Sequence, residues 1–308
     1  MTSAQALRSA LIPSRESQRG MALLLVMWVI VLMGILLGSF ALISRTENLQ
    51  SRHMFDATSG RYDAQAGLER AVYELRNPDV TQRWVGDGRP YEFDYEGAHI
   101  RIEITDETGK IDLNTANDQI LKQLFLSVGV DEMNAEGLAE AIMDWRDPDD
   151  LPRPQGAEAA QYAAAGLPYG PRNGRFQTVA EVQQVFGMNY DLYRKIEPAI
   201  TISSGTGMPN PAFAPIEALR ALPGMTEDLA QEIVTMRQQV PFGQASGLTL
   251  PNGTPIMANG GGLTYSIKSR ATLPNGASTV LDASIRVGGI GNNGRPYTIL
   301  RWRDGEAS

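Results

Sequence analysis

An uninterrupted apolar segment near the start of the chain limits the folds open to it more than any other feature. Residues 21–43 read MALLLVMWVIVLMGILLGSFALI and hold no charged side chain. About 20 apolar residues cross the hydrocarbon core of a bilayer as a helix, so this segment is predicted to span a membrane. Residues 1–20 carry three arginines and one glutamate. By the positive-inside rule, the N-terminus then lies in the cytoplasm and residues 44–308 lie across the membrane.

The helical pattern continues beyond the apolar segment. Residues 44–76 contain no proline, and Asn77-Pro78 is a stop signal. An apolar stripe with helical spacing is formed by Leu68, Ala71, Val72 and Leu75. We therefore expect one helix over residues 21–76, apolar in its first half and amphipathic in its second half.

Two groups of segments alternate apolar and polar side chains, as β-strands do. Residues 91–105 alternate on both sides of Gly97, which is typical of a β-hairpin. Alternation returns at 263–267 and 279–287, and 297–302 is a further expected strand. An isolated hairpin is only marginally stable in water. We therefore expect the early and late strands to join one antiparallel sheet that packs on the amphipathic part of the helix.

Residues 112–240, between these strands, are predicted to be helical. They contain an approximate repeat of helix, tight glycine turn and helix, with turns near Gly129 and Gly224 and a half copy near Gly187. Such units resemble the helix-hairpin-helix module, which often binds DNA through backbone N–H groups. Here 18 acidic residues face 9 basic ones, and the whole chain carries a net charge of −8. A surface of that sign repels phosphates, so a membrane-anchored DNA receptor is the alternative function and not the preferred one.

An acidic segment follows within the predicted helical part. Four carboxylates fall within seven residues, and prolines at 148 and 152 keep them on a loop: Asp144, Asp147, Asp149 and Asp150. Further oxygens nearby in the sequence belong to Glu158, Asn173 and Glu181. Ligands that are all oxygen suit Ca²⁺ better than zinc, although the EF-hand pattern is absent. A solvated acidic loop and a hydrolytic carboxylate pair are the alternatives.

The rare residues exclude several kinds of site. The sequence has no cysteine and two histidines, His53 and His99. It therefore has no disulfide, no thiolate zinc site and no cysteine nucleophile, and little from which to build a Ser-His-Asp triad. We expect a protein that is not an enzyme.

Three stretches together resemble a known family. Residues 19–28, RGMALLLVMW, resemble the prepilin leader junction of type IV pilin-like proteins. Residues 106–116, DETGKIDLNTA, and 144–150, DWRDPDD, resemble the minor pseudopilin K of type II secretion. The order of parts along the chain also agrees with that family.

The resemblance implies an α+β fold. A long, pilin-like N-terminal helix would pack on an antiparallel sheet, and a large all-α domain of helix-hairpin-helix type would be inserted in the sheet. The expected parts are a prepilin leader (1–20), a transmembrane and filament-core helix (21–43), a pilin-like α+β domain (44–111 and 241–308) and the inserted helical domain (112–240).

The resemblance also implies how the chain is processed and where it acts. A prepilin peptidase would cleave after Gly20 and methylate the amine of Met21 in the inner membrane, and the globular part would be periplasmic. Leu25 stands at the fifth mature position, where most pilin-like proteins have glutamate. A subunit with no neighbour above it gains nothing from that glutamate. This fits a non-enzymatic subunit at the pseudopilus tip, which initiates or caps assembly with minor pseudopilins I and J and binds no nucleic acid.

Calcium binding in this type of protein fits the acidic segment. The expected structural Ca²⁺ ligands are Asp147, Asp149 and Asp150, followed by Asp144, Glu158 and Glu181.

Overall fold

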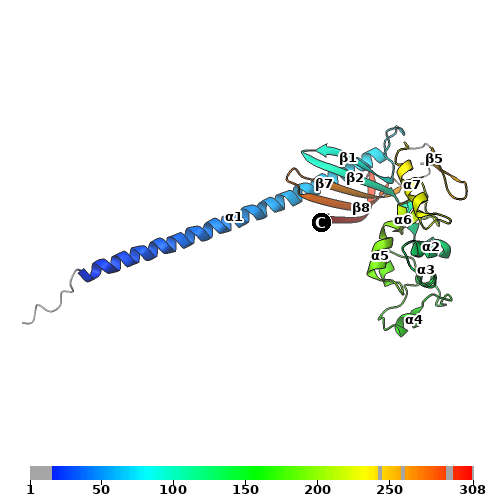
Figure 1. Cartoon of the computed structure of the whole chain (residues 1–308), viewed down its shortest axis with the longest axis horizontal. Coiled ribbons are helices and arrows are strands. Elements are labelled where there is room, and N and C mark those ends of the chain that lie inside the picture. The colour runs from blue at the N-terminus through cyan, green and yellow to red at the C-terminus, as the bar shows by residue number, and fades with distance from the viewer. Residues whose placement is uncertain (1–15, 242–244, 258–260, 289–293, 307–308) are drawn as a thin grey trace, which may run out of the picture. The chain divides into compact units, whose positions relative to one another are not determined.

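The chain divides into two compact units, residues 1–58 and 59–308, in the computed structural model. The structure describes residues 16–241, 245–257, 261–288 and 294–306. One helix, α1 (Glu16–Leu75), forms the described part of the first unit and continues into the second (Figure 1). It begins at Glu16, before the predicted start at residue 21, and it ends one residue before the predicted end.

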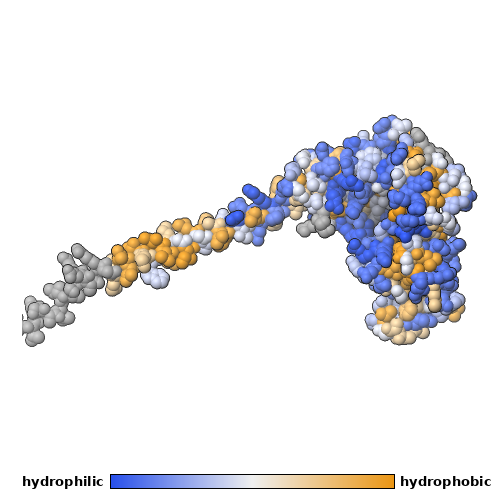
Figure 2. All heavy atoms as spheres, in the orientation of Figure 1, coloured by the Kyte–Doolittle hydropathy of each residue, from blue (hydrophilic) through white to orange (hydrophobic). Residues whose placement is uncertain are grey.

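The first unit presents its apolar side chains to its surroundings. Among the described residues, one helix, Met21–Leu75, is long and apolar enough to cross a membrane. The most apolar part of this helix has a mean hydropathy of 2.8 and is not buried at all. Figure 2 shows apolar atoms gathered along this part of α1. An apolar surface of this extent indicates a membrane anchor, because lipid or neighbouring helices must cover it.

The described strands of the second unit include a five-stranded antiparallel sheet with the order β1-β2-β7-β8-β9. Its strands are Asp87–Tyr95, Ala98–Asp106, Thr264–Thr272, Ser278–Val287 and Tyr297–Glu306. Gly97 turns the first hairpin with φ of 89°, a conformation that favours glycine. The predicted alternation is confirmed, because Ile100, Ile102 and Ile104 are fully buried on one face of β2. The pairing of β2 with β7 joins the early and late strands.

The last turns of α1 pack on this sheet. Leu68 and Ala71 are fully buried in one core with β2, β7 and β8. Gly67 allows the close approach, because a Cβ atom there would collide with Ser269 Oγ and press on Ile100. The expected α+β fold, a long N-terminal helix on an antiparallel sheet, is confirmed.

Between β2 and β7 the chain forms a mainly helical insert (Figure 1). Its helices are α2 (Asp118–Ser127), α3 (Glu132–Arg146), α4 (Ala159–Ala164), α5 (Tyr190–Ile196), α6 (Ile216–Leu219) and α7 (Glu227–Arg237). Short 3₁₀ turns are η1 (Glu107–Gly109), η2 (Val179–Gln184) and η3 (Glu197–Ala199). Two small strand pairs complete it, the parallel pair β3 (Ile111–Asp112) and β4 (Ile200–Thr201), and the antiparallel pair β5 (Ala245–Thr249) and β6 (Pro255–Met257).

The predicted repeat appears as helix, glycine turn and helix. The glycines between α2 and α3, between η2 and α5, and between α6 and α7 all have positive φ, at Gly129, Gly187 and Gly224. Such a glycine ends the first helix and lets the chain turn back. The second helix of each repeat copy begins at a side chain that caps its N-terminus. These capping residues are Asp131, Asn189 and Thr226.

The insert has a hydrophobic core of its own. Its largest fully buried side chains include Phe125, Tyr162 and Phe213. Ile256, on β6, belongs to the same core, and Leu248, on β5, packs against it. The β5–β6 pair therefore packs with the insert, although it lies beyond residue 240, where the sequence suggested the insert would end.

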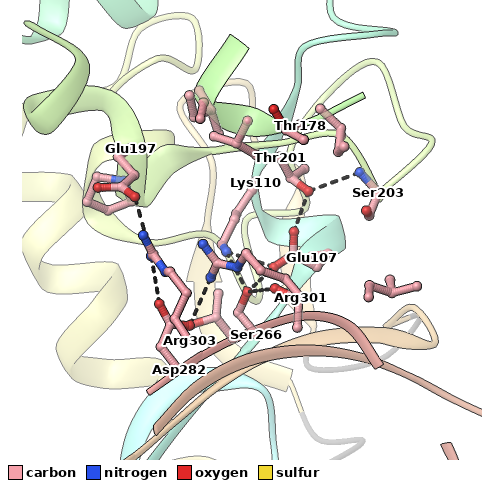
Figure 3. A pocket seen from close by; sticks show the side chains of 18 of the residues that line it. Glu107, Lys110, Thr178, Glu197, Thr201, Ser203, Ser266, Asp282, Arg301 and Arg303 are labelled. Atoms are coloured by element: carbon pink, nitrogen blue, oxygen red, sulfur yellow. Dashed lines mark hydrogen bonds and ion pairs between the residues drawn. The ribbon is translucent and has the colours of Figure 1, made fainter. Parts of the chain in front are cut away.

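A cavity of about 610 Å³ opens where the insert meets the sheet (Figure 3). One wall comes from β2, β7, β8 and β9, and the other from η2, η3 and β4. Both walls belong to the second unit.

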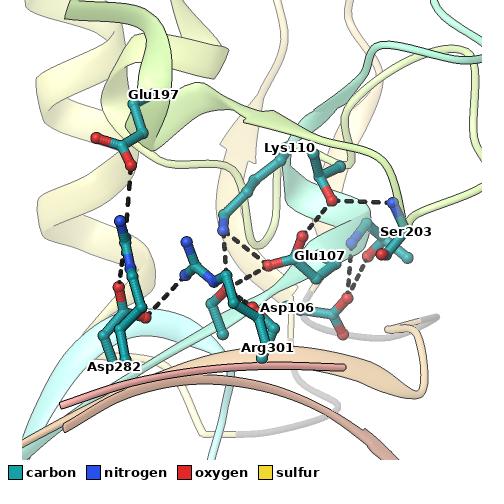
Figure 4. A network of polar contacts seen from close by, with 12 residues as sticks. Asp106, Glu107, Lys110, Glu197, Ser203, Asp282 and Arg301 are labelled. Carbon is teal, nitrogen blue, oxygen red and sulfur yellow. Dashed lines mark hydrogen bonds and ion pairs between the residues drawn. The ribbon is translucent and has the colours of Figure 1, made fainter. Parts of the chain in front are cut away.

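Glu107, at the start of the insert, holds this junction together (Figure 4). Its carboxylate is buried, with Oε1 2.7 Å from Lys110 Nζ, and it accepts hydrogen bonds from Ser266 on β7 and Thr201 on β4. Burial opposes the ionised form, but Lys110 and the two hydroxyls outweigh burial and lower the pKa of Glu107. The ionised carboxylate thus ties three separate segments together.

Replacing Lys110 with methionine should destabilise the chain strongly. Lys110→Met leaves the Glu107 carboxylate buried without its cation, which should cost about 3–5 kcal/mol of the free energy of unfolding. Urea denaturation of the full chain in detergent measures this. Glu107→Gln combined with Lys110→Met should recover most of the loss, because the buried charge is then gone.

Lys122→Met provides a matched control. Lys122 pairs with Glu132 and Glu136 at the surface, so its loss should cost less than about 1 kcal/mol. Equal losses for Lys110→Met and Lys122→Met would contradict the role given to Glu107.

A candidate metal centre

The acidic segment forms the loop between α3 and α4. Asp144 lies in the last turn of α3 and is fully buried, and Glu158, the N-cap residue of α4, is only 3% exposed. Pro148 and Pro152 prevent a regular helix between them. The charge of Asp144 acts on Glu158, so the loop brings its two ends close together.

Among the residues that the structure describes, five buried oxygens in this region have no hydrogen-bond partner. They are one each from Asp144 (Oδ1), Asp147 (Oδ1) and Asn173 (Oδ1), and both carboxylate oxygens of Glu158. The capping contact from the start of α4 to Glu158 does not reach hydrogen-bond geometry. Buried polar atoms are nearly always partnered, and an unpartnered buried carboxylate is costly. These oxygens therefore indicate a group that binds to acceptors.

The electrostatics of the loop agree with this interpretation. Burial and then the negative charges of Asp144 and Asp147 raise the pKa of Glu158 to about 7, and Asp150 and Asp149 act in the same direction. Burial also raises the pKa values of Asp144 and Asp147. The positive charge near the loop is thus too small to hold these carboxylates ionised at their ordinary pKa values.

Arg153 contacts two carboxylates of the cluster. Arg153 Nε lies 3.2 Å from Asp144 Oδ1, and its Nη2 lies 3.4 Å from Asp147 Oδ2. The first contact is an ion pair without hydrogen-bond geometry, so Arg153 gives Asp144 Oδ1 a charge partner but no hydrogen bond. Glycine at position 156 lets the loop approach the Asp144 carboxylate, because a Cβ atom there would collide with Asp144 Oδ2. The loop therefore fits closely around the Asp144 carboxylate.

The structure places the remaining predicted ligands differently from one another. Asp149 and Asp150 lie on the exposed side of the loop, and their charges help to raise the pKa of Glu158. Asp149 Oδ1 accepts a hydrogen bond from a backbone N–H, and Asp150 Oδ1 accepts one from Asn173. Glu181 instead caps η2. Both of its oxygens have partners, from backbone N–H groups at 177 and 178 and from Arg172 at 3.4 Å.

Asn173 joins the cluster, although the sequence marked it only as a nearby oxygen. Its φ of 49° lies in the left-handed region, and its Nδ2 donates to Asp149 O at 3.1 Å and to Asp150 Oδ1 at 2.7 Å. Its amide oxygen is left buried and unpartnered. The asparagine next to Gly174 signals a tight turn, but no spacing rule connects that turn with a loop more than 20 residues earlier.

The donor set fits a hard cation. The unpartnered oxygens belong to carboxylates and an amide, which is the ligand chemistry of Ca²⁺. The unpartnered nitrogen in this region, Trp145 Nε1, is a hydrogen-bond donor and does not ligate a cation. In the described part of the chain, no three His, Cys, Asp or Glu side chains already form a set able to hold a metal. The amide oxygen of Asn173 falls outside that set, and backbone carbonyls can also ligate Ca²⁺. The residues therefore fit Ca²⁺ through a mixture of ligand types.

The part of the chain that holds this centre matches a family model. Residues 103–205 match the family described as "Type II secretion system (T2SS), protein K". That range covers the start of the insert, the acidic loop and Asn173.

Curated relatives and a solved structure point to the same family as the family model. Type II secretion system protein K from Pectobacterium carotovorum subsp. carotovorum is 26% identical over 272 residues, covering 77% of this chain and 82% of the relative. The protein of the same name from Pseudomonas aeruginosa is 25% identical, covering 83% of each. A chain in the crystal structure of the GspK-GspI-GspJ complex from enterotoxigenic Escherichia coli has a TM-score of 0.53 at 18% identity, covering 86% of this chain and 99% of that one.

The similarity of that solved chain shows the fold, and the family model and the relatives agree on one family. The resemblance seen in the sequence is thereby confirmed: residues 103–205 match the type II secretion system protein K model, and the relatives of similar sequence carry that name.

Proposed function

We propose that this chain is the minor pseudopilin at the tip of the type II secretion pseudopilus, a structural, non-enzymatic subunit that initiates or caps assembly for protein export. The observation that carries the proposal is the helical insert, which enters between the neighbouring strands β2 and β7 of a pilin-like sheet. A subunit with so large an addition is suited to the end of a filament, where no further copy has to stack. The apolar part of α1 provides the segment that would join the filament core.

The proposed partners are the minor pseudopilins I and J. Support comes from the solved chain of similar fold, which was crystallised in a complex of GspK, GspI and GspJ. Leu25 also agrees with a place at the tip, because a subunit with no neighbour above it has no amine for a glutamate at that position to pair with.

The proposed tip position can be tested by labelling one site. The chain has no cysteine, and Met133 is 71% exposed, so Met133→Cys offers a single thiol for a gold label. Electron microscopy of labelled pseudopili should show gold at one end of each filament. A cysteine placed in the major pseudopilin should label the whole length, and gold from this chain along the whole length would contradict the proposal.

The proposed route to the filament passes through the inner membrane. The N-terminus would be cytoplasmic and the globular part periplasmic, which follows from the excess of arginine in residues 1–20. A prepilin peptidase would cut after Gly20 and methylate Met21.

Intact-mass spectrometry tests the processing directly. Expression of the full chain with a prepilin peptidase should remove residues 1–20 and add one methyl group. The chain expressed without the peptidase is the control and should keep its full mass. An uncut chain in the presence of an active peptidase would reduce α1 to an ordinary anchor.

The loop between α3 and α4 is proposed to hold a structural Ca²⁺. Asp144, Asp147, Glu158 and Asn173 would supply buried oxygens, and Asp149 and Asp150 lie at the exposed side. Bound there, the ion would supply positive charge to carboxylates that otherwise repel one another. The chain's own part is to bring together the end of α3 and the start of α4.

Calcium should raise the melting temperature of the full chain in detergent, because a ligand that binds only the folded state stabilises it by mass action. At 100 times the dissociation constant the gain is about 2.7 kcal/mol. Asp144→Asn and Glu158→Gln should lose this rise, whereas Asp228→Asn, at an exposed position on α7, should keep it. A melting temperature that Ca²⁺ and EGTA leave unchanged would rule out the site.

In the presence of EGTA, the stability of the original chain and that of Glu158→Gln should depend differently on pH. The pKa of Glu158 is raised from 4.5 to about 7 on folding, so between these values the unfolded chain has lost a proton that the folded chain keeps. The free energy of unfolding should therefore fall as pH rises through this window, and Glu158→Gln should reduce that slope. Equal slopes in the two chains would remove the evidence for a strained carboxylate.

A further inference from the structure

The cavity between insert and sheet contains acidic and basic side chains, but they are not equally satisfied. The acidic ones all have partners. Glu107 pairs with Lys110, and Glu103 accepts from Arg101 at 3.2 Å. Both oxygens of Asp282 are bound by arginines at 2.8 Å, and Glu197 faces Arg303 at 3.4 Å (Figure 3).

The basic side chains keep unused donors. Arg301 donates a hydrogen bond from Nη2 to Asp282, but its Nε is buried with no hydrogen-bond partner among the described residues. Lys268 is exposed on the same wall, and within the described residues it has no hydrogen bond or ion pair. Figures 3 and 4 show the Arg301 side chain between Asp282 and the Glu107 network. The unmet hydrogen-bonding capacity of the cavity is thus of donor type and positive.

The cavity also has apolar surface beside these donors. Leu300, on β9, is 50% exposed and lines it, and Ile202 and Pro198 line the opposite wall. The volume of about 610 Å³ lies within the range of ligand pockets, about 300–1,000 Å³. Lys268 and Arg303 are exposed at the cavity, so it is open to solvent.

We propose that this cavity binds an extended peptide segment of a partner protein, in which an acidic side chain is flanked by apolar residues. The carboxylate would accept from exposed Lys268 and pair with the guanidinium of Arg301, and the apolar neighbours would contact Leu300 and Ile202. A nucleic acid is a poor fit, because four carboxylates line the same cavity and would repel successive phosphates. The cavity is far larger than a single small carboxylate requires, which favours a peptide over a free acid.

This inference does not depend on calcium binding or on the tip position. The acidic loop lines no part of the cavity. Failure of the peptide test therefore leaves the proposed function standing, and failure of the labelling test leaves the cavity standing.

Fluorescence polarisation with a defined probe tests the inference. The probe is a fluorescein-labelled, end-blocked peptide of sequence Gly-Leu-Glu-Leu-Gly, titrated with the full chain in detergent at low salt and pH 7. Saturable binding is expected, and the same peptide with glutamine in place of glutamate should bind at least tenfold more weakly. Loss of one charge-assisted hydrogen bond accounts for a factor of that size.

The variants identify the residues. Arg301→Gln should weaken binding at least tenfold, and Lys268→Gln, at an exposed position that leaves the fold intact, should weaken it several-fold. Arg194→Gln removes the same charge from α5 outside the cavity and should bind like the original chain. Acetate separates the two sources of a carboxylate, and it should compete only at far higher concentration than unlabelled peptide.

Three results would overturn the inference. The first is equal affinity for the glutamate and glutamine peptides. The second is an affinity that neither Arg301→Gln nor Lys268→Gln changes. The third is competition by acetate at the concentration of the peptide itself, which would replace the peptide with a small acid.

Discussion

The pairing of β2 with β7 is the constraint on which the second unit depends. Eight residue pairs align these strands, from His99 with Thr272 to Asp106 with Tyr265. The strands are separated in sequence by the whole insert, so their pairing closes a long loop, although the cost of closure grows only slowly with loop length. This pairing fixes both ends of the insert at the same end of the two neighbouring strands. The cavity and the Glu107 network exist because these ends are held there.

Much of the second unit follows from patterns in the sequence. Alternation at 91–105 and 279–287 predicted strands, and the stripe at Leu68 and Ala71 predicted the face that α1 buries. These patterns work because one buried face dictates a period of two in a strand and 3.6 in a helix. The glycine turns at Gly129 and Gly224 were predictable for a different reason. A backbone with positive φ strongly favours glycine.

The candidate sites were less accessible to sequence reasoning. The acidic loop was found because its carboxylates are adjacent, but Asn173 enters the cluster through a turn far along the chain. The Glu181 carboxylate looked equivalent to Glu158 in the sequence, yet the structure uses it as a helix cap. Arg301 and Lys268 share a wall only because β7, β8 and β9 pair in one register. Contacts between distant segments decide which of these side chains come together, and the spacing of residues along the chain does not predict those contacts.

The small parallel pair β3–β4 closes the first part of the insert on itself. It joins Ile111 with Ile200 and Asp112 with Thr201, and Leu113 N also donates to Thr201 O. Parallel strands with nearly 90 residues between them cannot form as a local hairpin, so this pair needs the first part of the insert to be compact already. A compact insert in turn shortens the effective distance between β2 and β7. The contacts within the insert therefore lower the closure cost of the sheet that the insert interrupts.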